Sequence, residues 1–162
     1  MTEQEKQQHK QFLQEAVRLA RENVASGKGG PFGAVIVKDG QVIVRACNQV
    51  LESKDPTMHA EVNAIRQACQ KLGHFELKDC IIYSSCEPCP MCLGAIYWAR
   101  PKALFFAADR KTASTHGFDD DFIYKELALP TGQRHIPTVC MCLDEAEDPF
   151  VAWDKKADKV QY

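Results

Sequence analysis

Three regularly spaced cysteines are the residues in this chain whose types and spacing most suggest chemistry. Cys86, Cys89 and Cys92 lie three residues apart in the segment 84–95, SSCEPCPMCLGA, and form two overlapping C-x-x-C pairs. A helix that begins at Cys89 would present Cys89 and Cys92 on one face of its first turn, and the prolines on either side of Cys89 suit such a start. A helix N-terminus favours thiolate over thiol, and two thiolates favour a soft divalent ion such as Zn²⁺.

A histidine and a carboxylate lie near the start of another predicted helix, in the segment 55–68, DPTMHAEVNAIRQA. His59 can supply a third ligand, which leaves the fourth tetrahedral position for water, as in catalytic zinc sites. Glu61 lies two residues further on. Residues i and i+2 of a helix point to different sides, so Glu61 is not expected to bind the same metal ion as His59. A carboxylate that is close to a metal but not bound to it is suited to moving protons. The alternative is a structural zinc, which needs a fourth protein ligand, and Cys86 is the local candidate.

The remaining pattern predicts one α/β domain over residues 1–162. Apolar residues at helical spacing end before Gly27, and Asp39-Gly40 between two β-branched runs predicts an antiparallel hairpin. Strands and helices then alternate, which implies a five-stranded mixed sheet covered by helices on both faces, a three-layer α/β/α sandwich. After the hairpin, the predicted elements are helices at 56–72, 89–98 and 149–157, strands at 80–84, 103–107 and 139–143, and one short helix in the loop-rich segment between the last two strands.

Composition and charge narrow the function classes. The chain has 162 residues, eight cysteines and a formal net charge of −2. Its N-terminus is polar and holds no apolar targeting segment, which predicts a cytoplasmic protein with reduced thiols. The longest apolar run, at 103–108, is far shorter than the about 20 residues that a membrane helix needs. A slightly acidic chain without a long basic run argues against nucleic acid as the main partner.

The other cysteines have no spacing that predicts a metal site. They fall in predicted strands or helices, where a free cysteine usually behaves as a small buried apolar residue. This expectation covers Cys47, Cys69, Cys80, Cys140 and Cys142.

The two metal motifs together match H-x-E…P-C-x-x-C, the signature of zinc-dependent base deaminases. With GGPFGAVIVKDG, SSCEPCPMCLGAIYWARPKALFFAA and GFDDDFIYKE in the same order, residues 29–126 resemble the cytidine and deoxycytidylate deaminase superfamily, and within it the bacterial guanine deaminases. The resemblance implies a cytidine deaminase-like fold, usually a homodimer. It also implies one Zn²⁺ per chain, held by His59, Cys89 and Cys92.

The activity that this resemblance implies is hydrolytic deamination of guanine, a small-molecule substrate, to xanthine and ammonia. Glu61 would take a proton from water, pass it to a ring nitrogen and later protonate the leaving amine.

Four residues resemble substrate contacts of this branch, and each has a structural alternative. Asn48 would form hydrogen bonds with the edge of the base; its structural alternative is to stabilise a turn. Asp120 would accept a hydrogen bond from a purine N–H; its alternative is to belong to a solvated acidic run. Phe32 would stack on the base or pack in the core. Tyr162, in a tail at about 158–162, would close the site of its own subunit or, with tail exchange, that of its neighbour; otherwise the tail is disordered.

Three other functions stay open at this point. A tRNA adenosine deaminase shares the metal and glutamate motifs, although the acidic run at 119–121 would repel phosphates. A deaminase of another small aminated heterocycle, such as cytosine, a pterin or a triazine, would differ only in pocket shape. A zinc-stabilised binding module without catalysis would leave Glu61 idle.

Overall fold

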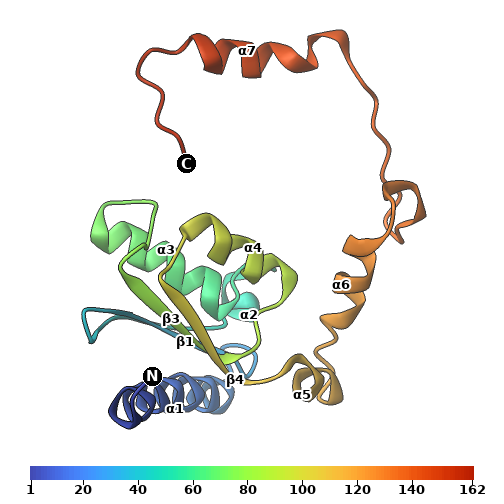
Figure 1. Cartoon of the computed structure of the whole chain (residues 1–162). Helices are drawn as coiled ribbons and strands as arrows, with labels where there is room; N and C mark the ends of the chain where they lie inside the picture. The colour runs from blue at the N-terminus through green and yellow to red at the C-terminus, as the bar shows by residue number, and fades with distance from the viewer. The chain divides into compact units, whose positions relative to one another are not determined.

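The computed structural model describes residues 1–162 and divides into two units, Met1–Asp121 and Phe122–Tyr162 (Figure 1). The N-terminal unit contains the whole β-sheet and the helices that cover it. The C-terminal unit consists of short helices joined by irregular chain. No helix in either unit is long and apolar enough to cross a membrane.

The sheet has four strands in the order β2-β1-β3-β4. β1 pairs antiparallel with both β2 and β3, whereas β3 and β4 are parallel, so the predicted hairpin and the predicted mixed sheet are confirmed. The hairpin turns at Asp39 and Gly40, which both have positive φ, the conformation that a two-residue turn of this kind requires. The strands are β1 (Gly33–Lys38), β2 (Gln41–Cys47), β3 (Cys80–Cys86) and β4 (Ala103–Ala108).

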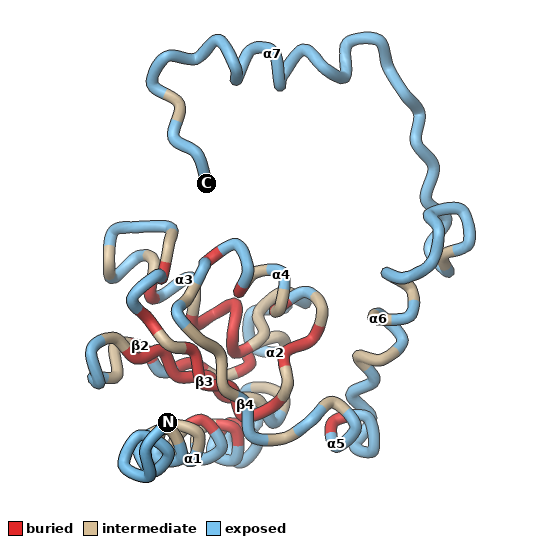
Figure 2. The backbone as a smooth tube through the Cα atoms, viewed as in Figure 1, coloured by how far each residue is buried: buried red, intermediate tan, exposed pale blue.

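The predicted fifth strand at 139–143 is wrong. This segment is irregular, pairs with no strand and exposes the alternating apolar side chains of Val139, Met141 and Leu143. Alternation identifies a segment that can form a half-buried strand, but a strand forms only where another strand completes its hydrogen bonds. The segment belongs to the C-terminal unit, where no residue is buried, as the exposed tube in Figure 2 shows.

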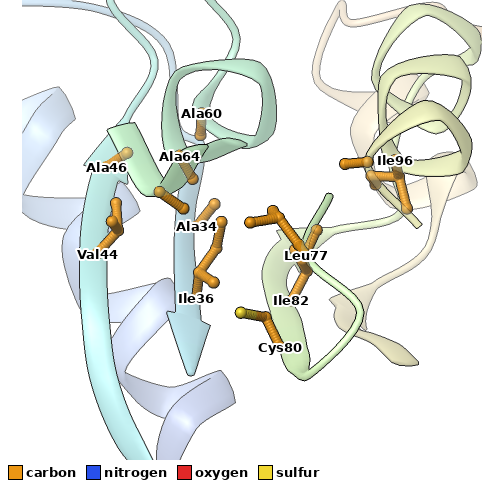
Figure 3. Packing of buried hydrophobic residues seen from close by; sticks show 12 residues of the cluster. Ala34, Ile36, Val44, Ala46, Ala60, Ala64, Leu77, Cys80, Ile82 and Ile96 are labelled. Carbon is orange, nitrogen blue, oxygen red and sulfur yellow. The ribbon is translucent and has the colours of Figure 1, made fainter. Parts of the chain in front are cut away.

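Helices cover both faces of the sheet and create two cores in the N-terminal unit. α1 (Glu3–Ser26) packs on one face through Ala16, which meets Val35 and Tyr83 of the strands. α3 (Ala60–Leu72) and α4 (Pro90–Ala99) pack on the other face. Ala60 and Ala64 of α3 share a core there with Ala34 and Ile36 of β1, and Ile96 of α4 belongs to the same core (Figure 3). β1 thus buries alternate residues toward opposite layers, as a central strand of a three-layer α/β/α unit does.

The helix boundaries differ from prediction at several points. α3 begins at Ala60 rather than near 56, because the Asp55 side chain accepts hydrogen bonds from the backbone and hydroxyl of Thr57 and holds that segment in a turn. The loop-rich segment holds two helices instead of one. The remaining helices are α2 (Val50–Ser53), α5 (Arg110–Thr115), α6 (Asp121–Ala128) and α7 (Asp148–Lys155), with the 3₁₀ turns η1 (Thr131–Gln133) and η2 (Asp144–Glu147).

Candidate metal centre

The N-termini of α3 and α4 bring the three predicted ligands together. His59 is the residue before the first turn of α3, in extended backbone conformation, and its side chain makes no capping bond to the helix. Cys89 occupies the same position on α4, where its sulfur accepts a hydrogen bond from the backbone N–H of Cys92 at 3.5 Å. Pro90 at the first helical position fits this start because it lacks an N–H group. Both ligand segments therefore depend on local helix-start chemistry.

The separations between the three ligand atoms fit one zinc ion. His59 Nδ1 lies 3.6 Å from Cys89 Sγ and 3.5 Å from Cys92 Sγ, and all three atoms lie within 4.8 Å of one another. Tetrahedral zinc with ordinary Zn–N and Zn–S distances requires N···S separations of about 3.6 Å. The donor set of one imidazole and two thiols also suits zinc rather than magnesium or calcium.

Cys86 lies outside this group. Its buried S–H group donates to the backbone carbonyl of Asp109 at 3.7 Å, and burial raises the pKa of its thiol to about 11. Neither Cys86 nor any other histidine, cysteine or acidic side chain joins the three-residue cluster as a fourth ligand. The geometry therefore gives no support to a structural zinc with four protein ligands. A tetrahedral ion held by the three residues would keep one position for a ligand from outside the chain.

The three ligands share protons among themselves. The hydrogen bond with Cys92, assisted by that with His59, lowers the pKa of the Cys89 thiol to about 4. The same contact with Cys89 raises the pKa of Cys92, and the hydrogen bond to Cys89 raises the pKa of His59. The lowered pKa favours the thiolate form of Cys89, and the raised pKa favours the protonated form of His59. Because ligands bind metal only when deprotonated, Zn²⁺ binding would release these protons.

Glu61 lies next to the ligands without joining them. Its side chain is only 4% exposed, and Oε2 lies 3.5 Å from Cys92 Sγ. The hydroxyl of Ser84, on β3, donates to Oε1 at 2.8 Å. Burial is the main cause that raises the pKa of Glu61. Such a carboxylate takes up a proton more readily than an exposed one, which suits proton transfer.

Ser84 is a site residue that the sequence did not reveal. Ser84 is one of two adjacent serines before Cys86, and no spacing distinguishes it from the other. Its one signal is its place in a strand whose neighbours Tyr83 and Ile82 are buried, because a buried hydroxyl needs a partner.

Asn48 follows β2 and is buried. Its side-chain oxygen accepts hydrogen bonds from the backbone N–H groups of Gly30 and Val50, each at 3.2 Å. No group of the chain accepts a hydrogen bond from its side-chain nitrogen, so the amide N–H₂ is the part of Asn48 that is left to bind a ligand. The oxygen therefore has the predicted role in a turn, while the role of the nitrogen in reading a base stays a prediction.

A second asparagine, which sequence reasoning missed, holds the loop before β1 in place. Asn23 is buried at the end of α1, and its side-chain nitrogen donates to the backbone carbonyls of Gly30 at 2.9 Å and Asn48 at 2.8 Å. Gly29 permits this close approach, because a Cβ atom there would collide with the backbone carbonyl of Asn48. The sequence contained one signal for this role: Asn23 lies three positions after Ala20, on the apolar side of the predicted helix, where a polar side chain needs a hydrogen-bond partner.

Asp120 is within electrostatic reach of the metal ligands. Its carboxylate is partly buried, and desolvation followed by the charge of Cys89 raises its pKa. Its own charge is one of the smaller causes that raise the pKa of His59. No group of the chain donates a hydrogen bond to this carboxylate, which leaves it free to accept one from a ligand.

Two aromatic rings and the chain end complete the predicted site residues. Phe32 is partly buried and meets Phe118 edge to face, with ring centroids 4.9 Å apart. This contact is compatible with a wall beside a flat base. Tyr162 belongs to the C-terminal unit, where its ring lies edge-on to Trp153 at 6.3 Å. Its role at the site stays a prediction.

Comparison with known proteins agrees with this geometry. The guanine deaminase of Bacillus subtilis (strain 168) is 58% identical over 154 residues, which cover 95% of this chain and 99% of that protein. The X-ray structure of guanine deaminase from Bacillus subtilis superposes on the chain with a TM-score of 0.93. The matched region covers 98% of the chain in that structure. The tRNA-specific adenosine deaminase of Aquifex aeolicus (strain VF5) is 45% identical over 146 residues, 90% of this chain and 93% of that protein.

The family itself is identified by a match over most of the N-terminal unit. The model of the cytidine and deoxycytidylate deaminase zinc-binding region matches residues 6–108, which include His59, Glu61 and both cysteine ligands. The resemblance predicted from the sequence is therefore confirmed, and the cluster of one histidine and two cysteines is consistent with one zinc ion. The chain belongs to the cytidine and deoxycytidylate deaminase family of zinc-binding hydrolases.

Proposed function

We propose that this protein catalyses the hydrolytic deamination of guanine to xanthine and ammonia. One observation carries the proposal: a buried carboxylate, Glu61, lies beside the cluster of His59, Cys89 and Cys92. These three ligands would leave a tetrahedral zinc ion one position for water. The near full-length similarity to a guanine deaminase supports guanine as the substrate.

The roles of the chain's own residues follow from their positions. Zn²⁺ held by His59, Cys89 and Cys92 would supply the Lewis acidity that makes water a nucleophile near neutral pH. Glu61 accepts the first proton of that water and passes it to a ring nitrogen. It then takes the second proton from the hydroxyl now on the ring carbon and gives it to the leaving amine, so that ammonia departs as the C–N bond breaks and the C=O bond forms. Ser84 holds one Glu61 oxygen in place, which leaves the other oxygen toward the cluster.

The polar groups around the cluster match guanine. Asn48 offers an N–H donor for an oxo or ring-nitrogen acceptor, and Asp120 offers a carboxylate for a ring N–H. Adenine presents an amino donor where guanine presents its oxo acceptor, so the donor from Asn48 suits guanine better. Phe32 and Phe118 would bound the flat faces of the base.

We also propose that the protein works in the reducing cytoplasm as a homodimer. Its eight cysteines are all free, as a reducing compartment would keep them. The C-terminal unit has no buried residue, and α4 exposes Tyr97 and Trp98. A second copy of the chain would cover such apolar side chains. In this arrangement the tail at about 158–162 would bring Tyr162 to the site of its own subunit or to that of its partner.

Ammonia release by the zinc-loaded protein tests the substrate directly. The panel comprises guanine, adenine, cytosine, cytidine, guanosine and an adenosine-containing tRNA anticodon stem-loop. We expect guanine to be the preferred substrate, with kcat/KM far above that of any other member. Dominant activity on the tRNA, with none on guanine, would overturn the proposal in favour of the tRNA adenosine deaminases. Turnover of cytosine alone would replace the substrate but keep the reaction.

A further inference from the structure

Two thiols lie far along the chain from the metal ligands and differ from the other cysteines in exposure. Cys140 and Cys142 are exposed, whereas the other six cysteines are buried or partly buried. The sequence-based expectation that these two are small buried apolar residues is therefore wrong. Both residues lie in the irregular segment that replaces the predicted fifth strand.

The two thiols face each other. Their Sγ atoms are 3.1 Å apart, within hydrogen-bonding distance for sulfur. A disulfide bond is about 2.05 Å long, so the sulfurs need to approach by only about 1 Å more.

A metal site at this pair is not supported. Zinc requires four ligands, of which the protein usually supplies three or four. The one cluster of three or more potential ligands in the chain is that of His59, Cys89 and Cys92, so Cys140 and Cys142 have no third partner. Two exposed thiols in contact, without further ligands, are suited to thiol–disulfide exchange instead.

We propose that Cys140 and Cys142 form a redox-active dithiol, which small-molecule disulfides such as glutathione disulfide oxidise to an intrachain disulfide. One cysteine thiolate attacks the disulfide, forms a mixed disulfide and displaces one glutathione thiolate. The second cysteine then loses its proton, attacks the protein sulfur of the mixed disulfide and displaces the other glutathione. In sum, two protein thiols and one glutathione disulfide give one protein disulfide and two reduced glutathione molecules.

The hydrogen bond between the two thiols also affects their protonation. The hydrogen bond with Cys142 raises the pKa of the Cys140 thiol, and either sulfur can be the donor. The proposal does not depend on the deaminase activity.

Peptide mass spectrometry after glutathione titration tests this directly. The zinc-loaded full chain is equilibrated with graded ratios of reduced and oxidised glutathione, quenched in acid and labelled with N-ethylmaleimide. Cleavage after Arg134 and Lys155 releases one peptide, 135–155, that contains both thiols and no other cysteine. We expect this peptide to lose two hydrogen atoms and its label at oxidising ratios, while zinc content stays constant.

Single variants separate a dithiol from two independent thiols. Cys140→Ser and Cys142→Ser should each leave one thiol that collects a glutathione adduct, whereas the matched control Cys69→Ser should keep the disulfide in peptide 135–155. A wild-type peptide that carries two glutathione groups, keeps both maleimide labels at every ratio, or is linked to a second chain would overturn the proposal.

Discussion

Glu61 is the residue around which the proposed chemistry is arranged. Burial raises its pKa, while the hydrogen bond from Ser84 acts in the opposite direction and holds one oxygen in a fixed position. Proton transfer needs the carboxylate in its ionised form at the start of the cycle. Activity should therefore fall as pH decreases through the raised pKa of Glu61, at a higher pH than for an ordinary glutamate.

Ser84→Ala removes the donor that stabilises the Glu61 carboxylate. Hydrogen bonds to charged groups contribute about 1.5–3 kcal/mol, so kcat should fall by roughly 10- to 100-fold. Loss of this bond raises the pKa of Glu61 further, which should move the acidic limb of the kcat profile to higher pH. Steady-state kinetics across pH measure both effects. Ser84→Thr, which keeps a hydroxyl, should restore the wild-type profile, and an unchanged profile in the alanine variant would exclude this role for Ser84.

Asn48→Asp distinguishes the two halves of the amide. The variant keeps an oxygen for the Gly30 and Val50 N–H groups but replaces the free N–H₂ donor by a second oxygen. We expect KM for guanine to rise by about 10-fold or more, because a buried donor is lost and a charge is introduced. Zinc content should change little, whereas the thermal unfolding transition should fall because a charge is placed at a buried position. Unaltered KM would show that the Asn48 side chain serves only its turn.

At the scale of elements, the metal ligands were predictable because each motif includes its own helix start. His59, Cys89 and Cys92 depend on short-range geometry that the sequence contains directly. The start of α3 was misplaced because the Asp55–Thr57 turn competes with a helix over the same residues. Ser84 and Asn23 act through contacts with residues distant in sequence, and no spacing rule reveals such pairs.

Gly29→Ala tests the packing of the loop that positions Asn48. The added Cβ would collide with the Asn48 carbonyl, so the loop must shift, at a cost of about 1–3 kcal/mol in the free energy of unfolding. KM for guanine should rise as Asn48 moves. Gly94→Ala is the matched control, because its Cβ meets nothing within 4 Å in the middle of α4. Alanine is the better helix former there by about 1 kcal/mol. Equal effects in chemical denaturation would contradict the packing argument.

At the scale of the whole molecule, the fifth strand marks the limit of sequence-based prediction. The segment 139–143 alternates apolar residues with cysteines, which suits a strand, but the segment itself does not encode which surface would cover them. The family match and the four-stranded sheet establish the N-terminal unit, whereas the C-terminal unit has no buried residues of its own. Because the C-terminal unit has no core of its own, we propose that a second copy of the chain covers its apolar side chains in a homodimer.

Mixing two inactive variants tests whether subunits share a site. Glu61→Gln lacks the proposed proton carrier, and Tyr162→Ala lacks the proposed closing residue. If Tyr162 closes the partner's site, mixed dimers formed by co-refolding should regain up to about a quarter to a half of wild-type activity, since one site per mixed dimer is complete. If it closes its own site, the mixture stays as inactive as its parts. A monomer by sedimentation equilibrium would rule out the proposed homodimer.

The most direct test of the central claim is guanine turnover by zinc-loaded Glu61→Gln. Glutamine has nearly the same shape but cannot carry the proton, and general acid–base catalysis contributes about 10²–10⁴-fold. Ammonia release should therefore fall by at least about 100-fold, with the zinc content and the thermal unfolding transition of the wild-type protein preserved. Wild-type turnover by this variant would contradict the account, since the buried carboxylate beside the metal cluster would then have no part in the reaction.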